Sequence, residues 1–211
     1  MKKLSCVLLI LVSASAFGQS FRDCADSYSD RYKRVQLDLA TRKITDKESD
    51  SLRTALDAEF QTCIIGKKID YDSLVKGSHE DYNAVSLSGK VVLFNFWSVN
   101  CGPCIAEIPF LNRLYFLYKG NKDFVFVSIL LNDEHELDKL LQQSVIRGGI
   151  KFPVLTNDKI TIKNKLKFVK AIPMNLFADR QGKIYMRTEG GIYNEESFEK
   201  IRSIIDSELL K

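Results

Sequence analysis

Two cysteines separated by two residues follow an apolar run in the stretch FNFWSVNCGPCIAEIP (94–109). The run VVLFNFW (91–97) is continuous, which is typical of a strand covered on both faces. We expect a helix from Cys104 to Tyr118, and Pro103 is tolerated there because the first helical amides have no internal partner. The sequence therefore predicts a strand, a short turn and a helix, with Cys101 at the helix start.

The start of a helix favours a thiolate on Cys101. The first helical amides are unpaired, and together with the helix dipole they attract an anion. Such a site holds the pKa of a thiol below the free value of about 8.5. Cys104 lies one turn into the helix, less exposed but within reach of the first sulfur. This arrangement predicts thiol–disulfide exchange, in which Cys101 attacks a partner and Cys104 releases it.

Two other uses of the cysteine pair remain open. Zinc normally takes four protein ligands, and the two histidines, His79 and His135, are far apart in the sequence and show no paired spacing. A purely structural disulfide would strain the helix start. Neither use is favoured, and we expect no metal and no other cofactor.

The first residues predict a secretory signal peptide over residues 1–18. Lys2 and Lys3 precede an apolar run over 4–12, and small residues follow in SASAFG. The run is too short to span a bilayer, which disfavours a membrane anchor, and Cys6 is a poor site for lipid attachment. We therefore expect an extracytoplasmic protein, most simply in the bacterial periplasm, with no transmembrane segment in the mature chain.

The whole chain has 211 residues, of which 45% are hydrophobic. This is enough for one globular domain plus an appendage. The formal net charge is +4 and the basic residues are scattered, without a cationic stripe interleaved with aromatic residues. Nucleic acid is therefore not an expected partner.

Residues 19–70 read as a helical hairpin appendage. Thr45 and Glu48 have the spacing of a capping box, and Gly66 is a plausible end for the helix that follows. An earlier helix is expected over about 22–40. Cys24 and Cys63 would then lie near the open end of the hairpin, where a structural disulfide would stabilise it. Free thiols and a second redox pair are the alternatives.

Residues 71–211 alternate between strands and helices. Besides 91–97, strands are expected at 123–131, 152–155, 174–179 and 183–188. Further helices are expected at 134–147, at 159–167 and from Asn194 onward. This order predicts an α/β layer sandwich with a mixed sheet.

Three segments resemble the exported TlpA-type thiol–disulfide oxidoreductases, which have the thioredoxin fold. They are FNFWSVNCGPCIAEIP (94–109), AIPMNLFADRQGKI (171–184) and the pair Gly190-Gly191. The resemblance covers roughly residues 70–211 and implies a thioredoxin-like three-layer sandwich with a mixed central sheet. It also implies that Pro173 is a cis-proline beside the cysteines, where an extended substrate segment could pair. The alternative is an ordinary trans proline at a strand start.

Three further residues are candidates through the resemblance. Asn95 replaces a buried aspartate that relays a proton in thioredoxins, and an amide cannot take a proton. Glu107 follows Cys104 by three positions on the same helix face, so it could accept the proton that Cys104 loses. The alternative for Glu107 is a solvated carboxylate. Trp97 is expected to pack beside the active site, a role compatible with plain core packing.

The leading interpretation is extracytoplasmic thiol–disulfide exchange that reduces protein disulfides. Its partners would be protein disulfides or dithiols, and a reducing role would require a membrane-embedded electron donor. The direction of electron flow depends on the potential of the pair relative to its electron source. One alternative is a thiol peroxidase on the same fold, and another is a non-catalytic binding module whose disulfide is inert.

Overall fold

The computed structural model describes residues 19–75, 82–132, 135–138, 148–156 and 159–211. The predicted signal peptide over 1–18 lies outside these residues, as does most of the helix predicted at 134–147, of which 135–138 are helical. No helix in the described ranges combines the length and the apolar character that a bilayer crossing requires.

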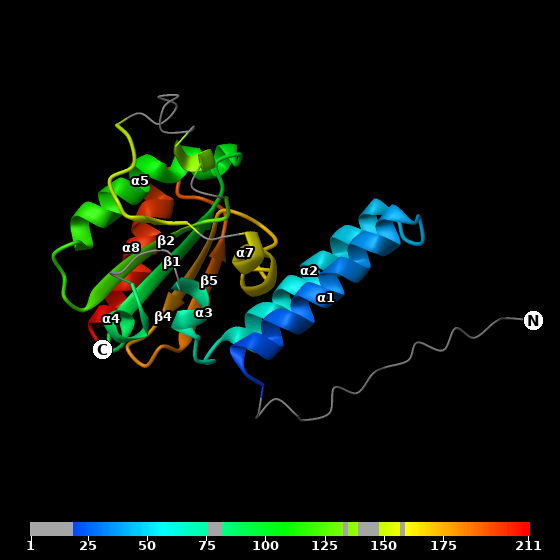
Figure 1. The fold of residues 1–211 in the computed structure, drawn as a ribbon, viewed down its shortest axis with the longest axis horizontal. Coiled ribbons are helices and arrows are strands. Elements are labelled where there is room, and N and C mark those ends of the chain that lie inside the picture. Colours follow the sequence, from blue (N-terminus) through cyan, green and yellow to red (C-terminus); the bar gives the residue numbers. More distant parts are fainter. Residues whose placement is uncertain (1–18, 76–81, 133–134, 139–147, 157–158) are drawn as a thin grey trace, which may run out of the picture.

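A mixed sheet of five strands forms the centre of the described structure, in the order β3-β2-β1-β4-β5 (Figure 1). β1, β2 and β3 run parallel, whereas β4 is antiparallel to both of its neighbours, β1 and β5. All seven residues of β1 are buried, as its continuous apolar sequence predicts. The strand bounds are β1 Val91–Trp97, β2 Phe124–Leu130, β3 Val154–Leu155, β4 Met174–Ala178 and β5 Ile184–Glu189.

Helices cover both faces of the sheet. On one face, α5 (Gly102–Tyr118) and α8 (Glu195–Leu209) pack against Leu93 and other residues of one β1 face. On the other face, Phe94 and its β1 neighbours share a cluster with helices from the first half of the chain and with residues around α7. The result is a three-layer α/β/α arrangement, as predicted. The other labelled helices are α1 Phe21–Ala40, α2 Asp46–Ile64, α3 Tyr71–Val75, α4 Ala84–Leu87 and α7 Lys159–Lys165.

The two long N-terminal helices begin at reciprocal caps. The Thr45 hydroxyl accepts from the Glu48 amide at 3.3 Å, and the Glu48 carboxylate accepts from the Thr45 amide at 2.8 Å. The predicted capping box is therefore confirmed. Ser20 and Asp23 make the same pair of contacts at the start of α1. Gly66 follows α2 with a φ of +77°, a left-handed conformation that suits glycine at a helix end.

The hairpin of α1 and α2 is continuous with the core on one face of the sheet. The ring of Phe168 meets that of Phe21 from α1 edge-on at 5.2 Å and that of Phe96 from β1 edge-on at 5.8 Å. Pairs of this geometry contribute about 0.5–1.5 kcal/mol each beyond their buried area. Figure 1 shows the far end of the hairpin projecting away from the sheet, so only its near half is anchored in this way.

A disulfide joins Cys24 of α1 to Cys63 of α2, with the two Cα atoms 5.9 Å apart. Cys24 lies near the start of α1 and Cys63 near the end of α2, so both lie at the open end of the hairpin. Cys24 is 3% exposed and belongs to the cluster that the hairpin shares with β1. The bridge therefore closes the hairpin at its anchored end.

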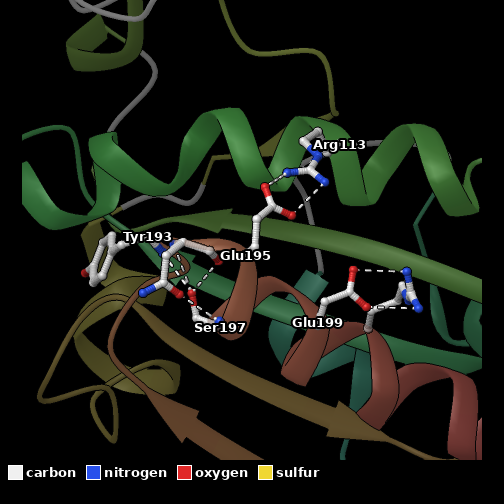
Figure 2. A network of polar contacts seen from close by, with 7 residues as sticks. Arg113, Tyr193, Glu195, Ser197 and Glu199 are labelled. Atoms are coloured by element: carbon white, nitrogen blue, oxygen red, sulfur yellow. Dashed lines mark hydrogen bonds and ion pairs between the residues drawn. The ribbon is translucent and has the colours of Figure 1, made fainter.

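An ion pair fixes α5 against the start of α8. Figure 2 shows the two terminal guanidinium nitrogens of Arg113 facing the carboxylate of Glu195. They donate to its two oxygens at 2.5 and 3.1 Å. The same guanidinium lies 4.3 Å from the ring centroid of Phe198. Asn194 caps α8 by accepting from the amide of Ser197 at 2.9 Å. These contacts hold the loop that precedes α8, whose amide groups enter the candidate site described below.

Three elements differ from the sequence prediction for local reasons. α3 and α4 have five and four residues, which is too short for a helical repeat to show in the sequence. The strand predicted at 152–155 is reduced to Val154–Leu155, which pairs with β2. Pro153 has no amide to donate to a strand ladder, so pairing begins after it.

Removing the hairpin bridge should destabilise the protein. The bridge spans 39 residues, and a closed loop of that length contributes about 4 kcal/mol in the chain-entropy account. We expect the double variant Cys24→Ala/Cys63→Ala to lose about 3–4 kcal/mol of unfolding free energy in urea titration. A loss below about 1 kcal/mol would show that the aromatic packing alone anchors the hairpin.

Candidate active site

Cys101 and Cys104 form a disulfide at the start of α5. β1 ends at Trp97, and the following turn brings Cys101 to the N-cap position of the helix. The sulfur of Cys101 accepts a hydrogen bond from the backbone amide of Cys104 at 3.2 Å. Cys101 is partly exposed, whereas Cys104 is only 1% exposed. An incoming sulfur therefore meets Cys101 first.

A loop from later in the chain lies against the Cys101 sulfur. The Ile172–Pro173 peptide bond is cis, and the carbonyl oxygen of Ile172 lies 3.8 Å from the Cys101 sulfur. The carbonyl of Pro173 accepts from the amide of Gly190 at 3.0 Å. Residues 172–173 therefore border the reactive sulfur and are tied to the loop before α8. This is the place that the resemblance implies for Pro173.

Glu107 is fully buried, one turn beyond Cys104 on α5. Its Oε1 accepts from the Nδ2 of Asn95 at 3.0 Å, and its Oε2 accepts from the amide of Ile192 at 3.2 Å. The alternative of a solvated carboxylate is therefore wrong. Both contacts are donated to Glu107, which favours its ionised form.

Asn95 lies in the middle of β1 and is also fully buried. Its Nδ2 donates to Glu107 and, at 3.0 Å, to the Oδ1 of Asn175. Its own Oδ1 has no hydrogen-bond partner among the residues that the structure describes. The site thus contains a buried carboxyl group next to an unpaired acceptor. That acceptor could receive a hydrogen bond if the carboxyl were protonated and the Asn95 amide turned over.

Trp97 closes the strand that leads to the cysteines. Its indole N–H donates to the hydroxyl of Ser128 on β2 at 2.8 Å. The ring is 1% exposed and belongs to the same buried cluster as Cys104 and Ile108. Trp97 therefore packs in the cluster that shields Cys104 from solvent.

Within the ranges that the structure describes, no group of three or more His, Cys, Asp and Glu side chains is arranged to hold a metal ion. The two sulfurs at the site are bonded to each other.

The sequence matches the profile of the AhpC/TSA family over residues 65–187, which is more than half of the chain. The chain belongs to the AhpC/TSA family. The matched range begins directly after α2 and includes both cysteines of the site and Pro173. The helical hairpin precedes it.

Family relatives include proteins named thiol-disulfide oxidoreductase ResA. The protein from Bacillus thuringiensis subsp. konkukian is 33% identical over 116 residues, which are 55% of this chain and 64% of the relative. The protein from Halalkalibacterium halodurans is 28% identical over 122 residues, which are 58% of this chain and 66% of the relative. The chain thus spans slightly less than two thirds of the length of these relatives.

A solved structure shares the fold. The thiol-disulfide isomerase from Corynebacterium glutamicum superposes with a TM-score of 0.53 at 18% identity, over 69% of this chain and 97% of that protein. Together with the mixed sheet and its two helical layers, this likeness confirms the predicted thioredoxin-like fold.

The site around Glu107 contains two further polar residues that the sequence analysis missed. Asn175 pairs with Asn95 across β1 and β4, and Thr188 pairs with Asn175 across β4 and β5. The Nδ2 of Asn175 donates to the Thr188 hydroxyl at 3.3 Å. A signal was present, since Asn175 interrupts the otherwise apolar strand MNLFA. Three strands therefore carry a polar chain that ends at Glu107.

Burial controls the ionisation of Glu107. Removal from water raises the pKa of the Glu107 carboxyl from 4.5 to about 7, while the hydrogen bonds from Asn95 and Ile192 oppose that rise. Glu107 therefore changes its charge near neutral pH, where a proton acceptor is effective.

The raised pKa of Glu107 has a consequence for stability. Between pH 4.5 and about 7, the folded chain keeps a proton that the unfolded chain has lost, so unfolding becomes easier as the pH rises through this window. A pKa difference of this size corresponds to about 3 kcal/mol. We expect Glu107→Gln to remove most of this pH dependence, measured as the difference in unfolding free energy between pH 5 and pH 8. An unchanged pH dependence would show that Glu107 is not the group responsible.

The polar chain should tune Glu107 in graded steps. Asn95→Leu removes a donor to the carboxylate and should raise the pKa of Glu107 by about one to two units, since a hydrogen bond to a charged group contributes about 1.5–3 kcal/mol. Asn175→Leu should also raise the pKa of Glu107, but by less. It removes only the acceptor that orients the Asn95 amide and leaves the donor to Glu107 in place. Thr188→Val should have the smallest effect. Carboxyl carbon NMR of the three variants measures this order, and a larger effect of Thr188→Val than of Asn95→Leu would contradict it.

Proposed function

We propose that this protein catalyses thiol–disulfide exchange through Cys101 and Cys104. The observation that carries the proposal is the asymmetry of the pair at the helix start. The sulfur of Cys101 is partly exposed and accepts from an unpaired helical amide, whereas Cys104 is buried behind it. A helix start stabilises a thiolate, which is the attacking form in exchange.

The reduced protein would begin with the Cys101 thiolate. This thiolate attacks one sulfur of a partner disulfide, forming a bond between Cys101 and the partner and breaking the disulfide of the partner. The second partner sulfur leaves as a thiolate and takes up a proton. Because Ile172 borders the Cys101 sulfur, the partner segment would lie along residues 171–173.

Cys104 would complete the exchange. Its thiol loses a proton, and the thiolate attacks the Cys101 sulfur, which releases the partner as a dithiol and restores the disulfide seen in the structure. Two electrons pass from the protein to the partner. Glu107, three positions further along α5 with a pKa near neutrality, is proposed as the acceptor of the Cys104 proton.

The exchange is proposed to occur outside the cytoplasm and to reduce protein disulfides. The amino-terminal pattern of two lysines, an apolar run and small residues supports export, so the protein is proposed to act outside the cytoplasm, in a bacterial periplasm. The proposed direction is reduction of protein disulfides. A membrane-embedded dithiol donor would then restore the reduced pair after each turnover.

Trapping of the intermediate tests the reaction. Without Cys104, the partner cannot be displaced from Cys101, so Cys104→Ala should accumulate mixed disulfides with a protein disulfide substrate. These adducts should run as a reducible shift on gels and in mass spectra. Cys101→Ala is the matched control and should trap nothing, because the buried Cys104 is not accessible to a partner.

Two results would favour another function over thiol–disulfide exchange. Consumption of hydrogen peroxide by the reduced protein at a catalytic rate would favour a thiol peroxidase. A Cys101–Cys104 bridge that resists a large excess of dithiol would favour a binding module with an inert disulfide.

A further inference from the structure

We propose that a pocket between the helical hairpin and residues 170–171 binds an acidic side chain of the partner polypeptide, close to its reacting cysteine. The inference rests on the proposed exchange reaction and adds a substrate preference to it. It also assigns a role to the hairpin, which lies before the range that matches the family.

The pocket has a volume of about 290 Å³ and lies beside the reactive loop. This is at the lower limit for small-molecule sites, so it suits one side chain rather than a whole ligand. α1 and α2 form one wall and the chain before the cis-proline forms the other. The residues used here are Tyr32, Asp50, Arg53, Asp57, Lys170 and Ala171.

The pocket is within reach of a partner held on Cys101. Ala171 lines it, and the next residue, Ile172, has its carbonyl oxygen 3.8 Å from the Cys101 sulfur. Consecutive Cα atoms are about 3.8 Å apart, and an extended chain advances about 3.3 Å per residue. A partner joined to Cys101 and extended along residues 171–173 therefore passes Ala171, at the pocket lining, within a few residues of its own cysteine.

Three of the four charged residues in the lining are already paired. Asp50 forms an ion pair with Arg53 on the same helix. Asp57 accepts from the hydroxyl of Tyr28 and lies 3.8 Å from the guanidinium of Arg187. These groups therefore have opposite charges or donors close by.

Lys170 is the exception. Its ammonium group donates to the hydroxyl of Ser29 at 3.2 Å and lies 5.5 Å from the ring centroid of Tyr32, both neutral groups. In the described part of the chain, no carboxylate lies within ion-pair distance of it. Partial burial lowers the pKa of Lys170, and repulsion from Lys33 and Lys167 acts in the same direction, while the more distant carboxylate of Asp30 opposes it.

A carboxylate is the ligand that would supply the Lys170 ammonium with a partner of opposite charge. It would offset the partial desolvation of the Lys170 ammonium and accept a charge-assisted hydrogen bond. Contacts other than the Cys24–Cys63 bridge hold part of the pocket in advance. Asp57 lies 3.8 Å from the Arg187 guanidinium of β5, and Phe168, two residues before Lys170, packs against Phe96 of β1. Little ordering is then needed on binding, which favours affinity.

Paired peptide substrates test the proposal. Each peptide carries one cysteine in a mixed disulfide with a chromophoric thiol, and the flanking residues at positions two and three on both sides are Glu in one peptide and Gln in the other. The reduced full-length protein should release the chromophore from the Glu peptide roughly three- to tenfold faster at low salt. Lys170→Met should bring this ratio to about one, and Lys170→Glu should reverse the preference in favour of a Lys-flanked peptide.

The matched control is Lys167→Met. Lys167 lies three positions away, is paired with Asp26 at 3.1 Å and does not line the pocket, so the ratio should be kept. Equal rates for the Glu and Gln peptides in the unsubstituted protein would overturn the pocket assignment. A preference that survives in Lys170→Met would also overturn it. No release from either peptide would instead contradict the exchange reaction itself.

Discussion

The burial of β1 on both faces determines where the groups of the site lie. Every residue of this strand is shielded, so successive side chains are committed to opposite helical layers and cannot exchange faces without exposing apolar surface. Leu93, Asn95 and Trp97 consequently face the layer of α5 and α8, while Phe94 and Phe96 face the layer of the hairpin. The same strand ends just before α5, so its position also sets the direction from which the Cys101 sulfur meets the first amides of the helix.

Burying polar groups in this interior costs free energy unless they are hydrogen-bonded. An isolated buried carboxylate is unfavourable, and Glu107 is made tolerable by two donors rather than by a cation. The chain through Asn95, Asn175 and Thr188 extends this support across three strands. The support is incomplete, because the Oδ1 of Asn95 finds no partner in the described ranges of the chain. An interior optimised for stability alone would avoid both features.

Much of the fold follows from sequence pattern, and the exceptions have physical reasons. β1, the caps of α2 and α8 and the position of Cys101 at a helix start depend on local chemistry, so short motifs predict them. The surroundings of Glu107 do not, because they include Ile192, which donates to its carboxylate from a loop 85 positions later in the chain. Asn175 and Lys170 were missed for the same reason. A polar residue in a strand or a lysine in a loop acquires meaning only when the strand register or the facing helix is known.

The hairpin and the thioredoxin-like layers share one core, so the aromatic rings around Phe168 connect regions that the sequence alone suggests are separate. A different aromatic residue provides a spectroscopic signal from the site. Trp97 is the single tryptophan in the chain, and it packs in the buried cluster that contains Cys104. Because a disulfide quenches nearby indole emission more than thiols do, the intrinsic fluorescence of the protein reports the oxidation state of this pair without any added label.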